Sequence, residues 1–278
     1  MTWNVENYVA ENRLVDGAYR PQYPKTEEAK AALRATVRAL RPDLLALQEM
    51  GPEPYLEELQ RDLATEGLAL PHRVLLAGPD AVRHVAVLSR VPLTRVGRHA
   101  VVPFRWRESS LFVRRGVLEV AVDLPGGEVT LFVVHLKSRH TESGDDPNAA
   151  AQRAGEAEAV RDLILGRFPD PAAARFLVLG DCNDAPRSRP LQALSRRGQT
   201  LIATLVPAAD ARGDAWTYYF HQAEEFARVD YVLASPGLLP AVTAGRAEIP
   251  DTPEIRRASD HRPVLVRLCA EAPTAGRK

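Results

Sequence analysis

A short apolar run that ends abruptly in acidic and amide side chains constrains the fold of this chain most. Residues 176–179 are typical of a buried β-strand, which Gly180 breaks. Asp181 and Asn183 follow before Pro186 ends any regular structure. Two such side chains on one turn can point into one pocket, where sheet-based enzymes place their chemistry. Asp and Asn are also ordinary turn residues, so this turn alone is a weak signal.

The same arrangement recurs at other predicted strand ends. A second apolar run precedes Glu49 and a third precedes His135. Each has a simpler explanation, because Glu49 fits a solvated turn and a lone His after a strand is usually structural. Asp230 lies within the strand-like residues 228–234, where a buried carboxylate is costly unless its charge is paired.

The two ends of the chain add to this set. The alternation in residues 3–8 predicts a half-buried strand, although a frayed edge is the simpler interpretation of these residues alone. Asp260 and His261 precede a predicted strand, and such a pair is hard to explain as packing. The polar residues at or near predicted strand ends are therefore Asn4, Glu49, His135, Asp181, Asn183, Asp230, Asp260 and His261.

The pattern of elements predicts the fold. Thr26 caps a helix that continues to about Leu40, and Pro125 to Gly127 mark a hairpin turn. Further helices are expected at 54–66, 150–168 and 190–197, and strands at 44–47, 73–76, 85–89, 111–113, 117–124, 128–136, 216–220 and 264–268. We therefore expect an α+β (α/β) sandwich of four layers, with two mixed β-sheets packed face to face and helices on the outside.

Composition is ordinary for a globular protein, with 45% hydrophobic and 26% charged residues among 278. We find no linker or repeat, so we expect one domain over residues 1–269 and a disordered tail at 270–278. The formal net charge is zero, so any attraction for phosphate must be local. Cys182 and Cys269 lack metal-site spacing and are expected to be buried free thiols.

The first residues bear on location. No run approaches membrane-spanning length, and the first six residues lack the basic and apolar segments of a signal peptide. We expect a cytoplasmic protein, with secretion as the alternative if a leader precedes this chain. Nothing in the sequence calls for an obligate protein partner, so we expect a monomer.

The residue types at the strand ends indicate a chemistry. Oxygen ligands without a cysteine-histidine cluster favour Mg²⁺ or Mn²⁺ over zinc. Two histidines, one of which a carboxylate can orient, indicate proton transfer or transition-state stabilisation. Together these groups predict metal-assisted attack of water on a phosphorus centre.

Seven motifs in order resemble the endonuclease/exonuclease/phosphatase superfamily. They are Trp-Asn-Val-Glu-Asn at 3–7, Leu-Gln-Glu at 47–49, Leu-Ser-Arg-x-Pro-Leu at 88–93, His-Leu-Lys-Ser at 135–138, Leu-Gly-Asp-x-Asn-Asp at 179–184, Arg-Val-Asp-Tyr-Val-Leu at 228–233 and Ser-Asp-His-Arg-Pro-Val at 259–264. The resemblance, to pancreatic deoxyribonuclease-like and abasic endonuclease-like proteins and their bacterial members, spans residues 3 to 268.

The resemblance implies a role for each matched residue. Metal ligands would be Asn4, Glu49 and Asp260, with Glu6 a less certain addition. Asp181 would activate or position the water, Asp230 would pair with His261, and His135 would be a candidate general acid. His261 and Asn183 would contact the scissile phosphate. Further phosphate-binding residues would be Arg115, for which Arg114 is the rival, together with Lys137 and Tyr218.

These roles imply a divalent-metal-dependent phosphoesterase, in the first place a nuclease acting on phosphodiester bonds of nucleic acid. In favour of nucleic acid, a basic rim for a phosphate backbone could form from Arg105, Arg107, Arg114, Arg115, Arg139, Arg187 and Arg189. The alternative is a phosphatase or phospholipase-like hydrolase of small substrates, of the inositol phosphate or sphingomyelin type, because such a core tolerates many loop variations. A non-catalytic binding module is a third class, which the complete set of acids and histidines argues against. Residues 98–110 and 139–148 are candidate specificity loops.

Overall fold

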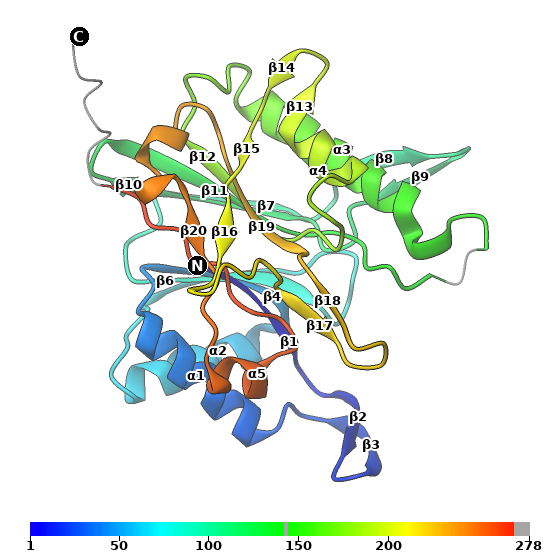
Figure 1. Ribbon diagram of the computed structural model, residues 1–278, viewed down its shortest axis with the longest axis vertical. Helices are drawn as coiled ribbons and strands as arrows, with labels where there is room; N and C mark the ends of the chain where they lie inside the picture. Colours follow the sequence, from blue (N-terminus) through cyan, green and yellow to red (C-terminus); the bar gives the residue numbers. More distant parts are fainter. Residues whose placement is uncertain (142–143, 270–278) are drawn as a thin grey trace.

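The chain forms four layers, helix, sheet, sheet and helix, in a computed structural model that describes residues 1–141 and 144–269 (Figure 1). Helices α1 (Glu27–Leu40), α2 (Glu53–Thr65) and α5 (Pro253–Ala258) cover one sheet, and α3 (Ala150–Arg167) and α4 (Arg189–Ser195) cover the other. This confirms the predicted fold class. The expected tail at 270–278 lies outside the described residues.

Both sheets are mixed. The first has the order β1 (Thr2–Tyr8), β4 (Leu44–Met50), β6 (His84–Ser89) and β5 (His72–Leu76). The second has the order β15 (Thr204–Leu205), β19 (Asp230–Ala234), β12 (Phe176–Asp181), β11 (Gly127–His135), β10 (Val117–Leu124) and β7 (Arg95–His99). In each sheet one pair is parallel, β1 with β4 and β11 with β12, and the other pairs are antiparallel.

Alternating side chains of the central strands build separate cores on the two faces of the second sheet. In β12, Leu177 and Leu179 face the other sheet, whereas Phe176 and Val178 pack beneath α3. Because both faces are covered, residues 176–179 of β12 form a continuous apolar run with no polar face. A third core lies between the first sheet and α1, α2 and α5.

Several local predictions are confirmed. The hydroxyl of Thr26 accepts a hydrogen bond from the backbone of Ala29 at 3.3 Å and caps α1. The hairpin of β10 and β11 turns where Pro125 and the two glycines predicted it. Cys182 is a buried free thiol, but Cys269 is only half-buried, so the prediction of two buried thiols was wrong for Cys269.

Two predictions about the ends of the chain were wrong. Strand β1 is neither half-buried nor frayed: Thr2 and Asn4 on its polar side are buried as well as Trp3 and Val5, and Thr2 bridges Val264 in the C-terminal segment. Residues 264–268 do not form the expected strand. They make isolated bridges to three different segments, because the chain runs in the gap between the sheets and follows no single neighbour.

The sequence predicted the short peripheral strands only in part: the strands expected at 111–113 and 216–220 each overlap one arm of a hairpin, whereas the partner arms and a further hairpin were not predicted. Two hairpins, β2 (Glu11–Val15) with β3 (Ala18–Tyr23) and β8 (Pro103–Trp106) with β9 (Ser109–Phe112), project from the sandwich (Figure 1). A third hairpin pairs β17 (Tyr218–Phe220) with β18 (Glu225–Ala227). The remaining elements are β13 (Arg196–Arg197), β14 (Thr200–Leu201), β16 (Ala208–Ala209), β20 (Ala247–Glu248) and three 3₁₀ turns at Pro147–Ala149, Leu239–Ala241 and Thr243–Gly245.

Candidate active site

Three neighbouring strands of the second sheet end in polar residues at the same level. In the strand register, His135 of β11 pairs with Asp181 of β12, and Asp181 pairs with Asp230 of β19. All three residues are about 1% exposed. The register therefore places one imidazole and two carboxyl groups side by side at one edge of the sheet, as the strand-end pattern of the sequence predicted.

Gly180 allows β12 to reach this edge. Its φ is +139°, and a Cβ there would lie 2.0 Å from the carbonyl oxygen of Val134. No side chain fits that close approach, so a glycine is required immediately before the catalytic candidate. Beyond it, the backbone of Asn183 donates to Asp181 Oδ1 at 2.8 Å, and the Asn183 amide donates to Asp181 Oδ2 at 3.2 Å. The turn thus fixes the carboxylate of Asp181.

The first sheet supplies Asn4 and Glu49 to the same edge. The amide of Asn4 donates to Asp181 Oδ2 at 3.0 Å, a hydrogen bond that joins the two sheets. Glu49 Oε2 accepts from the backbone of Asn7 at 3.0 Å. Glu6, Asn7, Glu49 and Asn183 all have positive φ, between 48° and 61°, a sparsely populated region for these residues. Strained backbone of this kind concentrates at functional sites.

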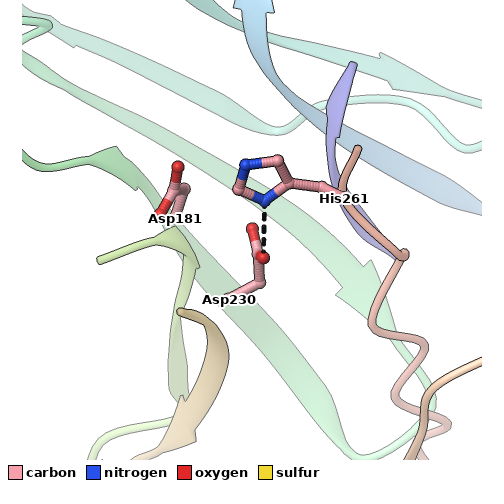
Figure 2. A group of neighbouring side chains, drawn as sticks. All are labelled: Asp181, Asp230 and His261. Atoms are coloured by element: carbon pink, nitrogen blue, oxygen red, sulfur yellow. Dashed lines mark hydrogen bonds and ion pairs between the residues drawn. The ribbon is translucent and has the colours of Figure 1, made fainter. Parts of the chain in front are cut away.

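The C-terminal segment brings His261 to the two sheets. Ser259 ties it down, because its hydroxyl donates to the carbonyl of Asn4 at 2.8 Å and accepts from the backbone of His261 at 3.0 Å. His261 Nδ1 lies 2.8 Å from Asp230 Oδ2. Figure 2 shows the Asp230 carboxylate directed at the His261 ring, with Asp181 beside the pair. The predicted pairing of His261 with Asp230 is present.

Burial and crowding set the protonation of these groups. Burial opposes the protonation of His261, but the charge and hydrogen bond of Asp230 raise the pKa of His261 well above its usual range. Burial, and then the charge of Asp230, raises the pKa of Asp181 to about 7. Burial also raises the pKa of Asp260 to about 7, with the charges of Glu6 and Glu49 adding to the effect. The site thus concentrates more negative charge than its own cations neutralise.

That excess of acidic oxygens fits a divalent cation. Asn4, Glu49 and Asp260 offer one amide and two carboxylates, the hard oxygen donors that Mg²⁺ and Mn²⁺ prefer. By distance alone, Asp181, Asp230 and His261 also group within 4.8 Å. A protonated His261 cannot be a ligand, however, and its Nδ1 is already bonded to Asp230. The acids of the first sheet and the C-terminal segment are the better candidates.

His135 differs from His261 in its environment. Its Nε2 lies 3.6 Å from Asp181 Oδ2 and 3.9 Å from Glu49 Oε1. Its Nδ1 is buried without a hydrogen-bond partner among the described residues. Burial, and then the nearby charge of Arg115, lowers the pKa of His135 well below its usual range, so the ring is neutral near pH 7. No acid in residues 68–90 contacts this ring in the described chain.

A cavity of about 710 Å³ opens above these groups. Its wall includes Glu49, Asp181, Asn183, Asp260 and His261. Tyr218 lies against His261, with 4.7 Å between ring centroids, so of the predicted phosphate-binding residues Asn183 and Tyr218 line this cavity. The other two, Arg115 and Lys137, line a neighbouring cavity instead.

Two buried cations that support the site escaped the sequence analysis. Lys25 is 4% exposed, and its Nζ donates to the carbonyl oxygen of Glu6 at 3.1 Å. Arg262 is 1% exposed, forms an ion pair with Asp210 at 2.9 Å and anchors the chain just beyond His261. A lysine before a helix cap carries no distinguishing signal. Arg262 did carry a distinguishing sequence signal, because it directly follows the Asp260-His261 pair.

The fold and this edge of acids, amides and a His-Asp pair define a class, the hydrolases that cleave phosphoester bonds with a divalent cation. The sequence matches the Endonuclease/Exonuclease/phosphatase family over residues 1–261, and the chain belongs to that family. Its members hydrolyse phosphoester bonds and depend on divalent metal ions. The resemblance seen in the motifs is thereby confirmed.

Solved structures support the fold at low sequence identity. An endonuclease/exonuclease/phosphatase family protein from Leptotrichia buccalis has a TM-score of 0.64 and 16% identity, covering 96% of this chain and 97% of that one. The human Nocturnin catalytic domain with bound sulfate has a TM-score of 0.63 and 17% identity, covering 95% and 91%. Beta toxin from Staphylococcus aureus with bound magnesium has a TM-score of 0.61 and 13% identity, covering 97% and 95%.

Two further comparisons gave negative results. No curated protein sequence matches this chain at a significant level. Among the helices of the described residues, none has both the length and the apolar character needed to cross a bilayer.

Proposed function

We propose that the protein is a phosphodiesterase that uses Mg²⁺ or Mn²⁺ and cleaves nucleic acid. One observation carries the proposal: the buried pair of His261 and Asp230, bonded at 2.8 Å, lies beside Asp181, with polar atoms of all three residues within 4.8 Å of one another (Figure 2). The pair supplies a fixed positive charge, and Asp181 supplies a carboxylate for water. The cytoplasmic location, the single domain and the monomeric state expected from the sequence stay predictions.

The residues divide the chemistry among them. Asn4, Glu49 and Asp260 would hold the cation, which when bound would polarise the phosphoryl oxygens and neutralise developing charge. Asp181 accepts the proton of the attacking water or orients it. The His261 cation and the Asn183 amide stabilise the negative charge that builds on the phosphate oxygens. Because the neutral ring of His135 can still donate one N–H, we assign it a hydrogen bond to the leaving oxygen.

Substrate comparison tests the proposal. Supercoiled plasmid DNA, single-stranded RNA, bis-p-nitrophenyl phosphate, an inositol phosphate and sphingomyelin would be supplied in parallel with Mg²⁺ or Mn²⁺. We expect nicking or degradation of nucleic acid, with loss of activity in EDTA. If the inositol phosphate or sphingomyelin is hydrolysed and nucleic acid is not, the same centre belongs to a phosphatase or phospholipase-like hydrolase of small substrates. Absence of any hydrolysis would leave a binding module.

Glu49→Gln tests the assigned metal ligand. The substitution removes one negative charge and keeps the side-chain shape, so the affinity for Mn²⁺ falls by an expected factor of about 10 to 100. The Mn²⁺ concentration for half-maximal activity rises in parallel. Titration of Mn²⁺ by electron paramagnetic resonance reads the affinity without turnover. Glu57→Gln, an exposed acid on α2, is the control, and equal affinities in all three proteins would remove Glu49 from the metal site.

A further inference from the structure

A second cavity, of about 670 Å³, adjoins the catalytic one. The two share Asn7, Glu49, Ser138 and His140 in their walls, so these side chains separate them. Their charges differ. Among the described residues, the catalytic cavity is lined by five acids, Glu6, Glu49, Asp181, Glu225 and Asp260, against two cations, Arg139 and the charged His261. The second cavity, which we call the basic pocket, is lined by Asp80, Arg83, Arg114, Arg115 and Lys137 besides Glu49.

Arg115 is the central cation of the basic pocket. The residue is 5% exposed, and its Nη1 is buried without a hydrogen-bond partner among the described residues. Its Nε lies 3.1 Å from Asp80 Oδ2, an ion pair without hydrogen-bond geometry. A buried guanidinium with unused donors is costly, because each donor has left water and gained nothing in return. Such a donor calls for an acceptor that the described residues do not supply.

Asp80 holds two arginines at the pocket. Its Oδ2 lies 3.1 Å from Arg115 Nε and 3.5 Å from Arg114 Nε, while its Oδ1 accepts from the backbone of Val82 and Arg83. The loop that carries Asp80 packs closely against the backbone of Arg115: a Cβ on Gly78 of this loop would lie only 2.7 Å from the Arg115 carbonyl carbon. With all these contacts made, Asp80 positions the arginines and has little capacity left to neutralise both.

The basic pocket therefore keeps an excess of positive charge. Arg83 is already paired with Glu11 at 3.1 Å, and Glu49 belongs to the proposed metal site. Among the described residues, three cations then remain at the pocket, Arg114, Arg115 and Lys137. Two acids oppose them, Asp80 in the wall and the buried Glu156, whose charge acts on Arg115 and Lys137. Burial lowers the pKa of Lys137, and the neighbouring charges of Arg114 and Arg115 lower it further. An anion in this pocket would relieve the repulsion and satisfy the unused donors of Arg115.

We propose that the basic pocket binds a second phosphate of the substrate, next to the phosphodiester held in the catalytic cavity. The inference rests on the proposed function and narrows its substrate class. The enzyme acts on chains in which phosphates follow one another, as in an oligonucleotide, and less well on an isolated phosphodiester. An acidic cavity that holds a cation and a basic cavity beside it would together receive two successive phosphates.

Binding of inorganic phosphate tests the pocket without catalysis. In EDTA the acids of the catalytic cavity repel phosphate, so calorimetric titration reports the basic pocket. We expect phosphate binding by the wild type and by His261→Ala, and a loss of about 10- to 100-fold in Arg115→Met and Arg114→Met. The Arg114 side chain is 56% exposed, so that variant folds even if Arg115→Met does not. Arg61→Met, at an exposed site on α2, is the matched control.

Dinucleotides test the substrate class. Thymidylyl thymidine is compared with its 5′-phosphorylated and 3′-phosphorylated forms. We expect one of these phosphates to raise kcat/KM by about 10- to 100-fold, and the gain to fall toward one in Arg114→Met and Arg115→Met. Inorganic phosphate added to the unphosphorylated dinucleotide should not reproduce the gain, which separates a linked phosphate from a free one.

The outcomes distinguish this inference from the proposed function. No phosphate binding in EDTA, or equal binding by wild type, Arg114→Met and Arg115→Met, overturns the pocket. Equal kcat/KM values for all three dinucleotides would contradict the preference for substrates with successive phosphates, but would leave the proposed phosphodiesterase activity intact. If no dinucleotide is cleaved but phosphate binding depends on Arg115, the nuclease proposal falls and the basic pocket remains an anion site.

Discussion

Asp181→Asn lowers turnover by about 10²- to 10⁴-fold and leaves the protein folded. The amide cannot take a proton from water, and it removes the negative charge from the centre of the site. The isosteric side chain still offers an oxygen to the Asn4 amide, which lies 3.0 Å from Asp181 Oδ2. The rate is measured at saturating metal on the best substrate, next to wild type and to Asp123→Asn, an exposed acid on β10.

The same substitution is expected to stabilise the metal-free protein. The folded pKa of Asp181, about 7, lies above its ordinary value of 3.8, so ionisation of this group opposes folding. Stability contributed by the protonated form is therefore lost as the pH rises from about 4 to about 7. An asparagine at position 181 does not ionise, so the variant keeps this stability as the pH rises. Its Tm in EDTA at pH 8 should therefore exceed that of wild type. A wild-type rate in Asp181→Asn, whatever its Tm, would show that the site is wrongly placed.

Activity and stability thus oppose each other at Asp181, and this conflict made the site visible in the sequence. An acid after a buried apolar run contradicts the pattern of a core strand, and selection for stability alone would not favour it. The same reasoning applies to Asp230, which lies inside a strand. These local conflicts, together with the order of the motifs, were enough to predict the fold class and the residues that meet at the sheet edge.

The rest depended on contacts that no local pattern encodes. The burial of β1 follows from its bridge to Val264, which is distant in sequence. Residues 264–268 are apolar enough to be a strand, but their hydrogen bonds go to several neighbours. Asp80 lies in a Gly-Pro-Asp turn, which predicts only a turn, and its role appears when Arg114 and Arg115 meet it. Pairing between distant segments, more than propensity, decided these features.

Asp230→Asn is the second substitution with a large expected effect. The Asp230 carboxylate raises the pKa of His261 against the opposing effect of burial. Without that charge, burial dominates and the pKa of His261 falls, so the ring becomes neutral as the pH rises. The variant therefore loses the fixed cation beside the phosphate, and the amide can also select the wrong tautomer of the ring. We expect about a 10²- to 10⁴-fold loss of turnover near pH 8.

The pH dependence separates this role from a merely structural one. In wild type the raised pKa of His261 keeps the ring charged through neutral pH, so its deprotonation does not limit activity there. In Asp230→Asn the activity falls as the pH rises through the lowered pKa of His261, and part of it returns as the pH is lowered again. Profiles of kcat/KM for wild type, Asp230→Asn and His261→Ala, at saturating Mg²⁺, give the comparison. Because the pair acts as one unit, the double variant loses little beyond His261→Ala. Additive losses, or an unchanged profile in Asp230→Asn, would mean that Asp230 does not act through His261.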